Sequence, residues 1–143
     1  MKKVKQLLDY VAIHPYAILT HHASDMVLAG NSDTSYLSET KSRSRPGEIF
    51  FMSNDTALPP NNGAVLTIAI IIKEVMSSAA EAELGALFIN CKEATPSCES
   101  LEEMGHTQPL TPMQTENTTA HGLVTNNIAS KRLKSMDMRL HWL

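Results

Sequence analysis

The 143-residue chain has little cysteine, few aromatic side chains and no long apolar run. Two cysteines, Cys91 and Cys98, cannot build a disulfide framework or a Cys-x-x-Cys site, and they suit a reducing compartment. The longest apolar stretch, Ala64 to Ile72, is far shorter than the roughly 20 residues that a membrane span needs. Asp9 interrupts the apolar stretch that would follow the N-terminal lysines of a secretory signal. We therefore expect a compact protein of the cytoplasm or nucleus, without membrane partners.

The net charge of −3 is unevenly distributed along the chain. Residues 74–116 carry one lysine against eight glutamates, whereas residues 117–143 carry four basic residues against one aspartate. Two interpretations fit: solvated helix faces and loops, or an acidic metal-binding centre with phosphate-contacting arms around it. Charge alone leaves both open. The basic stretches are Lys2–Lys5, Lys41–Arg45 and Lys131–Lys134.

The first half of the chain predicts one helix followed by three strands. Apolar residues at helical spacing predict an amphipathic helix over 3–13, which His14-Pro15 ends. Three apolar runs with short connections then favour an antiparallel meander. The runs are Met26–Ala29, Ile49–Met52 and Ala64–Ile72, and the predicted turns are Arg45-Pro46-Gly47 and Leu58–Gly63.

After the meander the apolar period changes from strand-like to helical. Ser78 and Glu81 have capping-box spacing, which predicts a helix over about 79–93. A separate Glu-rich helical piece is expected to end at Gly105. The order of elements predicts an α+β fold, a sheet covered by helices. The remaining predicted elements are a strand over Pro109–Gln114 and helices over Thr118–Val124 and Met136–Leu143.

Three acidic residues, Asp33, Glu83 and Glu116, lie where the predicted strands end or helices begin. Carboxylates that converge from separate elements are what a two-metal phosphoryl-transfer site requires. Mg²⁺ prefers such hard oxygen ligands. Spacing alone leaves a second interpretation open, in which the three are unrelated surface groups.

Four motifs give a more specific hypothesis because of the order in which they occur. They are Asn31–Tyr36 (NSDTSY), Ser77–Leu84 (SSAAEAEL), Gln114–Ala120 (QTENTTA) and Met136–His141 (MDMRLH). Together they resemble the ribonuclease H domain at the end of the Pol polyprotein of copia-type LTR retrotransposons. The likeness covers nearly the whole chain: residues 1–22 resemble the end of the preceding reverse transcriptase region, and residues 23–143 resemble the nuclease.

The resemblance implies a ribonuclease H-like mixed sheet and hydrolysis of the RNA strand of an RNA–DNA hybrid with two Mg²⁺ ions. Asp33 matches the family's first-strand catalytic aspartate. Glu83, rather than Glu81, matches the helix glutamate, and Glu116 takes the place of the third carboxylate. All three would then be catalytic residues and metal ligands. The reverse transcriptase region of the same polyprotein would be a partner.

The basic stretch Lys41–Arg45 is the best candidate for contact with nucleic-acid phosphates, through Lys41, Arg43 and Arg45. The alternative interpretation of this stretch is a solvated loop. If it binds hybrid, the affinity is expected to fall steeply with salt, because each contact releases counterions.

The sequence also departs from the family pattern. Glu116 stands where the family has aspartate, and one further methylene moves a carboxylate by about 1.5 Å, whereas a productive site tolerates about 0.5 Å. The chain ends before the family's fifth strand and fourth aspartate, and Asp137 belongs to an earlier segment. We therefore expect a C-terminally incomplete, degenerate copy that is weak or inactive. The alternatives are a non-catalytic nucleic-acid-binding remnant and a pseudogene product without selected function.

Overall fold

The computed structural model describes residues 2–125. The predicted helix over Met136–Leu143, with Asp137, and the basic stretch Lys131–Lys134 lie outside the described residues. The elements within them are α1 (Lys2–Ile13), β1 (Val27–Glu39), β2 (Arg43–Ser53), β3 (Ala64–Ala69), α2 (Ala79–Glu103), β4 (Met113–Thr115) and α3 (Thr118–Val124).

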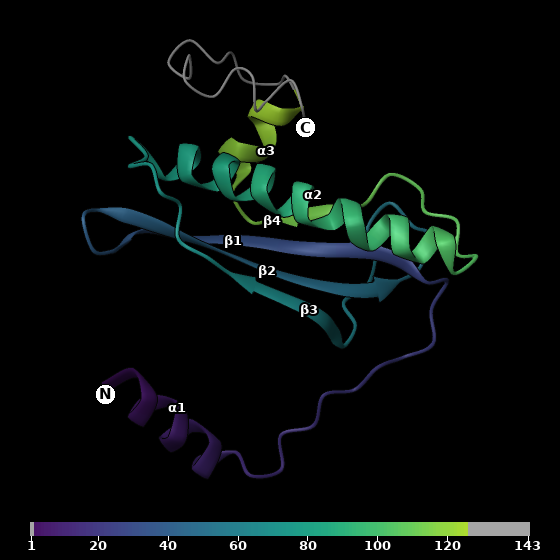
Figure 1. Cartoon of the computed structure of the whole chain (residues 1–143), viewed down its shortest axis with the longest axis horizontal. Coiled ribbons are helices and arrows are strands. Elements are labelled where there is room, and N and C mark those ends of the chain that lie inside the picture. The colour runs from purple at the N-terminus through teal and green to yellow at the C-terminus, as the bar shows by residue number, and fades with distance from the viewer. Residues whose placement is uncertain (1, 126–143) are drawn as a thin grey trace.

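The sheet is mixed and has the strand order β3-β2-β1-β4. β1, β2 and β3 form the predicted antiparallel meander, and β4 joins the other side of β1 in parallel. Helix α2 lies along one face of this sheet (Figure 1). The α+β class and the meander are confirmed, and the parallel pairing of β4 follows from the helical crossover between β3 and β4.

β1 and β2 are longer than their apolar runs predicted. Asp33 lies inside β1 rather than after it, and the predicted turn at Arg45-Pro46-Gly47 is wrong, because these residues are part of β2. The two strands pair from Val27 opposite Ser53 to Ser35 opposite Arg45, so cross-strand hydrogen bonds extend the strands through polar residues. Pro46 is tolerated because β3 pairs with β2 only from Gly47 onward.

Helix α2 is one continuous element, whereas the sequence predicted two separate pieces. It begins as predicted: the Ser78 hydroxyl accepts a hydrogen bond of 3.1 Å from the backbone N–H of Glu81. It then runs through Pro96, and Gly105 follows the helix end with a φ of +92°. Packing overrides the proline, because residues on both sides of it enter one core. That core contains Leu28, Phe50, Ala94 and Leu101.

The two elements after α2 are short. β4 has three residues and starts later than the predicted strand over Pro109–Gln114. Helix α3 has the predicted bounds. Its start is capped by Asn117, whose side-chain oxygen accepts a hydrogen bond of 2.9 Å from the backbone N–H of Ala120. This cap directly follows Glu116 and therefore fixes the chain at the end of β4.

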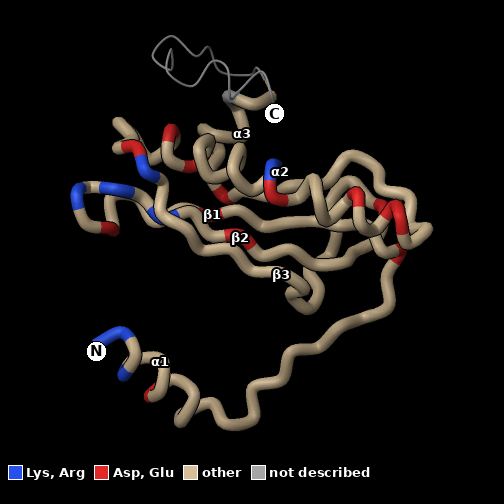
Figure 2. The backbone as a smooth tube through the Cα atoms, in the orientation of Figure 1, with Lys and Arg blue, Asp and Glu red and all other residues tan. Residues whose placement is uncertain are grey.

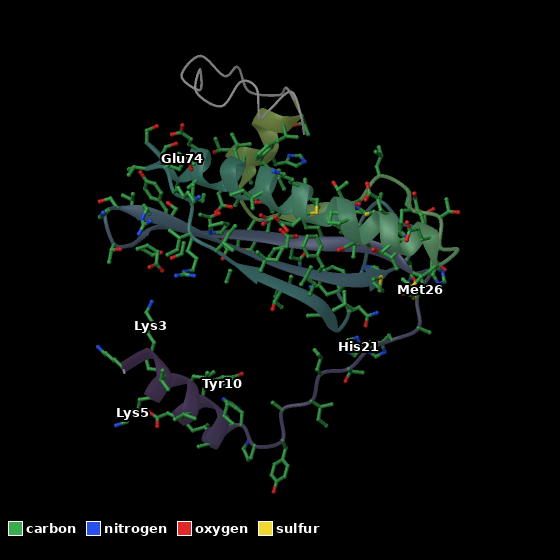
Figure 3. All side chains as sticks on the ribbon, in the orientation of Figure 1. Lys3, Lys5, Tyr10, His21, Met26 and Glu74 are labelled. Carbon is green, nitrogen blue, oxygen red and sulfur yellow. The ribbon has the colours of Figure 1, made fainter. Side chains whose placement is uncertain are left out.

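Helix α1 forms as predicted and has no buried residue. It lies apart from the sheet, on the side away from α2 (Figure 1). Lys3 points toward the sheet and Lys5 away from it (Figure 3). The connecting segment is held near its end by two hydrogen bonds, of 2.8 and 2.9 Å, between the backbone of His22 and the Asn62 side chain. No helix within residues 2–125 is long and apolar enough to cross a membrane.

Candidate carboxylate site

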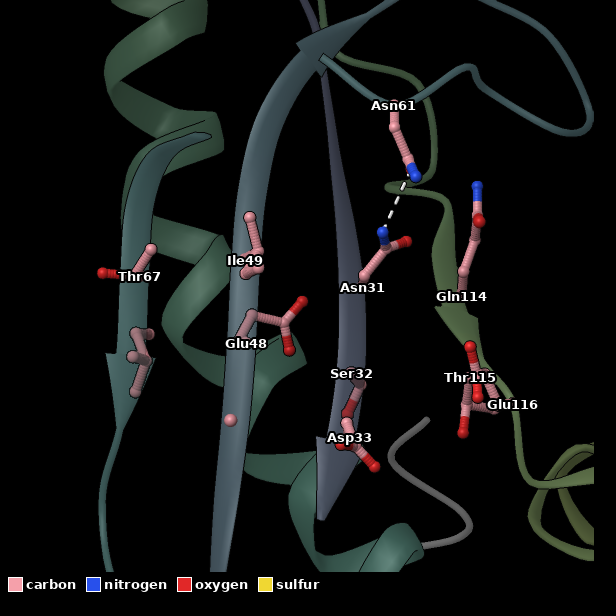
Figure 4. A pocket seen from close by; sticks show the side chains of 12 residues that line it. Asn31, Ser32, Asp33, Glu48, Ile49, Asn61, Thr67, Gln114, Thr115 and Glu116 are labelled. Atoms are coloured by element: carbon pink, nitrogen blue, oxygen red, sulfur yellow. Dashed lines mark hydrogen bonds between the residues drawn. The ribbon is translucent and has the colours of Figure 1, made fainter. Parts of the chain in front are cut away.

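A pocket of about 640 Å³ opens where β1, β2 and β4 lie side by side (Figure 4). Asp33 of β1 and Glu116, the residue after β4, both line it. The sheet register explains why they meet. Ser32 of β1 stands opposite Thr115 of the parallel strand β4, so the residues that follow them leave the pair in the same direction.

Asp33 and Glu116 are both exposed, and Asp33 is held by its own strand. Its Oδ1 accepts a hydrogen bond of 2.7 Å from the backbone N–H of Thr34. This bond uses one oxygen and fixes the orientation of the carboxylate. The other oxygen of Asp33 is then available for a ligand at the pocket.

Glu83 reaches this region from the first turns of α2. The Thr34 hydroxyl donates a hydrogen bond of 3.5 Å to the carbonyl of Ala82, which fastens α2 to β1 at this point. Burial raises the pKa of Glu83, the negative charge of Asp33 raises it further, and hydrogen bonds with Thr34 act in the opposite direction. Its Oε2 is buried without a hydrogen-bond partner in the described part of the chain.

The structure therefore brings the three sequence-predicted carboxylates together in two pairs. Asp33 shares the pocket with Glu116, and it is close enough to Glu83 for their charges to interact. Across residues 2–125, however, no group of three or more His, Cys, Asp or Glu side chains stands close enough to hold one metal ion. The pair Asp33–Glu83 fits Mg²⁺ best, because the buried, unpartnered Oε2 of Glu83 is a hard oxygen donor that lacks a positive partner.

The basic candidates lie on the β1–β2 hairpin (Figure 2). Lys41 is exposed at the tip, where its φ is +63°. Arg43 and Arg45 belong to β2 rather than to a loop. The Arg43 guanidinium donates hydrogen bonds to Thr40.

Arg45 already has a protein partner. Its Nε lies 2.7 Å from Oε1 of Glu39, and this hydrogen-bonded ion pair lowers the pKa of the Glu39 carboxyl. A further N–H of the guanidinium donates to the carbonyl of Ala69 at 3.1 Å. Among the described residues, Arg43 and Arg45 therefore each donate two hydrogen bonds, and the bond from Arg45 to Glu39 is also an ion pair.

Sequence reasoning missed the amide side chains of the pocket. Asn31 donates a hydrogen bond of 3.0 Å to Asn61 Oδ1, and Gln114 donates one of 3.1 Å to the carbonyl of Pro59. The signal for Asn31 was present, since alternate residues of a strand share a face and Asn31 is two residues from Asp33. Nothing in the sequence pattern indicates that Asn61, in the β2–β3 connection, returns to the same place.

Glu48 of β2 also borders the pocket, and it was also missed, but its side chain alternates with that of Ile49 and lies on the opposite face of the sheet. It is 2% exposed, and neither of its oxygens has a hydrogen-bond partner among the described residues. Burial raises its pKa to about 8. The signal was the strand period: Glu48 is two residues before Phe50, so the two side chains share a sheet face, and Phe50 lies in the core under α2.

Comparison of the chain with protein-family models, with curated proteins and with solved structures gives no match. The class is therefore defined by the fold and the site themselves. The protein is an α+β protein with a mixed four-stranded sheet and a carboxylate-lined pocket beside its first strand.

Proposed function

We propose that this chain is a degenerate ribonuclease H-like domain of a copia-type LTR retrotransposon that hydrolyses the RNA strand of RNA–DNA hybrids weakly. The observation that carries the proposal is the convergence of three elements around Asp33, in the middle of β1. The parallel register of β4 places Glu116 beside Asp33, and α2 brings Glu83 next to Asp33. These are the three positions at which the motifs resemble the family's carboxylates.

The topology supports the same proposal. An antiparallel meander of three strands is followed by a helix that crosses one sheet face, and the fourth strand then pairs in parallel with the first. This arrangement is compatible with a ribonuclease H-like fold. It also makes β1 an interior strand, so the strand that carries Asp33 is paired on both sides.

The chemistry follows from what each side chain can hold. Asp33 and Glu83 would bind Mg²⁺, which when bound supplies neutralisation of phosphate charge and an activated water molecule. The backbone N–H of Thr34 orients Asp33, and a cation bound between Asp33 and Glu83 would relieve the like-charge repulsion that, after burial, raises the pKa of Glu83. The side chain of Glu116 is about 1.5 Å longer than that of the family's aspartate, whereas a productive site tolerates a displacement of about 0.5 Å. This difference is the reason we propose weak activity.

Nucleic-acid contact is assigned to the cations of the β1–β2 hairpin. Arg45 pairs with Ser35, which is two residues along β1 from Asp33, or about 7 Å. Residues paired across strands share a sheet face, so Arg45 lies on the face that carries Asp33. Lys41 and Arg43 extend this basic edge toward the tip. A hybrid that reaches the pocket would place a phosphate backbone along it.

Helix α1 would connect the domain to its neighbour in the polyprotein. Leu7, Leu8 and Val11 form one apolar stripe, and they are 63%, 63% and 55% exposed. In a protein in aqueous solution, an apolar stripe of this kind is normally covered by another protein surface. We assign it to contact with the reverse transcriptase region that the resemblance places before the nuclease.

A second candidate function is a non-catalytic nucleic-acid-binding remnant. It is favoured by the absence, within residues 2–125, of a three-carboxylate group that could hold one metal ion. In this function, Lys41 and Arg43 would still contact phosphate, and no hydrolysis is required.

A cleavage assay on an RNA–DNA hybrid with labelled RNA, in Mg²⁺, tests the proposal. We expect slow cleavage of the RNA strand that disappears in Asp33→Asn and persists in Asp9→Asn, a control in the exposed helix α1. Rapid turnover would contradict degeneracy, and cleavage that survives Asp33→Asn would contradict the site. Salt-sensitive hybrid binding in EDTA without any cleavage would support the binding remnant instead. The absence of both cleavage and binding would contradict both functions and leave the pseudogene product.

A further inference from the structure

Glu48 lies in the layer between the sheet and helix α2, without a partner. Its cross-strand neighbour is Ser32, which is also buried, so both side chains point away from the face that carries Asp33. The Glu48 side chain is 2% exposed, and neither carboxyl oxygen has a hydrogen-bond partner in the described part of the protein. An unpaired carboxylate in such a place costs several kcal/mol of desolvation and normally takes up a proton.

The carboxyl lies against the backbone of β1, and the described elements around it supply no positive charge. On β1, a Cβ at Gly30 would lie 2.2 Å from Oε1 of Glu48 and 3.1 Å from the sulfur of Met113 on β4. On β3, Ile68 stands opposite Glu48 and is apolar. On α2, the titratable neighbour is Cys91, whose pKa is raised to about 11 by burial and then by the charge of Glu48.

A second buried side chain in the same layer is also an unpartnered acceptor. Asn90 of α2 is fully buried, and its Nδ2 donates a hydrogen bond of 2.8 Å to the hydroxyl of Ser32. Its Oδ1 has no partner among residues 2–125. The side chains that α2 and β1 present near Glu48 are therefore an amide, a hydroxyl and a thiol, and none of them carries a positive charge. This layer accommodates a neutral acid and opposes an anion.

We infer that Glu48 is a proton-controlled switch: as a neutral acid it permits α2 to pack on β1 and β2, and on ionisation it separates α2 from the sheet. Both carboxyl oxygens are buried without a partner in the layer that α2 covers, so water reaches them when α2 moves away from the sheet. The inference concerns the packing of α2 and stands whether or not the chain cleaves RNA.

The direction of the pH dependence follows from proton binding. The pKa of Glu48 is about 8 in the folded protein and 4.5 for an exposed glutamate, so the folded chain holds the proton more tightly. The contribution of Glu48 to the free energy of unfolding is therefore fully present below about pH 4.5 and is lost as the pH rises through about 8.

The test compares the full chain with Glu48→Gln, a neutral side chain of the same shape. Glu102→Gln, on the exposed side of α2, is the matched control. We expect the urea midpoint of the wild-type chain and of the control to fall between pH 5 and pH 8.5, and that of Glu48→Gln to change by less than half as much. An equal fall in Glu48→Gln would overturn the inference.

Two further measurements on folded protein identify the movement. Alkylation of Cys91, relative to Cys98, is expected to accelerate at least tenfold between pH 6 and pH 8.5 beyond the rise caused by thiolate formation. In Glu48→Gln, the ratio of the Cys91 alkylation rate to the Cys98 alkylation rate, corrected for thiolate formation, is expected to stay constant over this pH range. An increase of this ratio in Glu48→Gln would overturn the inference. If Glu48→Gln does not fold, a carboxyl NMR titration of the wild-type chain replaces it. A Glu48 midpoint near pH 8 supports the switch, and one near pH 4.5 overturns it.

Discussion

The two faces of the sheet treat the same chemical group in opposite ways. On the open face, Asp33 is exposed, accepts a hydrogen bond from the N–H of Thr34 and borders a pocket. On the face under α2, Glu48 is 2% exposed and has no donor among the described residues. A carboxylate that keeps water and a fixed orientation can take a cation, whereas a carboxylate stripped of both takes a proton. Environment, rather than residue type, separates a candidate ligand from a candidate switch.

One step of strand register produces this difference. Asp33 pairs with Gly47 and Ser32 with Glu48, so the two carboxylates are adjacent in the ladder but lie on opposite faces. The substitutions below change one face at a time, and each should leave the other face unchanged.

The largest expected effect comes from Gly30→Ala, which acts on the covered face. The added Cβ would lie 2.2 Å from Glu48 Oε1 and 3.1 Å from the sulfur of Met113, so both buried side chains must shift from their packed positions. We expect the free energy of unfolding to fall by about 2 kcal/mol, as for other overpacked cores. Urea unfolding at pH 6 measures it.

Gly47→Ala is the matched control, since the nearest atoms to its added Cβ lie at 4.0 Å. It should change the free energy of unfolding by less than about 0.5 kcal/mol. The double variant Gly30→Ala with Glu48→Ala should recover part of the loss, because it removes the clashing carboxyl. A loss that is the same with and without Glu48 would show that another contact causes it.

The next effect concerns the open face and the length of one side chain. Glu116→Asp shortens the third carboxylate to the family's length, which we expect to raise the rate of hybrid cleavage about tenfold. Single-turnover cleavage of labelled RNA in a hybrid measures the rate. Glu74→Asp applies the same change to a residue that does not line the pocket and should leave the rate unchanged. A slower Glu116→Asp protein would show that the longer side chain suits this site.

A smaller effect is expected at the start of α2, the helix that carries Glu83 and covers Glu48. Ser78→Ala removes the acceptor for the backbone N–H of Glu81 and should lower the free energy of unfolding by about 1 kcal/mol. Ser100→Ala, exposed on the same helix, should change it by less than half of that. Equal losses in thermal or urea unfolding would mean that the cap does not hold α2.

The smallest effect is expected at the hairpin tip. Lys41→Gln should weaken hybrid binding in EDTA about twofold to threefold and reduce the slope of log affinity against log salt by about one. Fluorescence anisotropy at several salt concentrations measures both. Lys73→Gln, an exposed lysine outside the hairpin, is the control. An unchanged slope in Lys41→Gln would assign phosphate contact to other residues.

The elements that could be predicted from the sequence are those with strong local signals. The apolar stripe of α1, the Ser78 cap and the bounds of α3 depend on residues within a few positions of each other. Pairing between residues that are far apart in the sequence leaves no such local signal. The extension of β1 through Asp33 and the strand conformation at Pro46 follow from contacts between β1 and β2, and the continuity of α2 through Pro96 follows from core packing.

The candidate site shows the same division. Motif resemblance identified Asp33, Glu83 and Glu116, and the structure places them around the middle of β1 as two pairs. Spacing could not predict those pairs, because they depend on the register of β4 against β1 and on the position of α2. Glu48 was missed because a charged residue in an apolar run is ordinarily assigned to the exposed face, and the alternation with Phe50 was the contrary signal.

The central claim is that Asp33 is part of a cation-binding site on the open face. Thermal unfolding of the wild-type chain, Asp33→Asn and Asp9→Asn, with and without Mg²⁺ at constant ionic strength, tests it most directly. Binding at tenfold excess over the Kd should raise the Tm by roughly 3 °C or more. We predict this rise in the wild-type chain and in Asp9→Asn and its loss in Asp33→Asn. An equal rise in Asp33→Asn would contradict the claim.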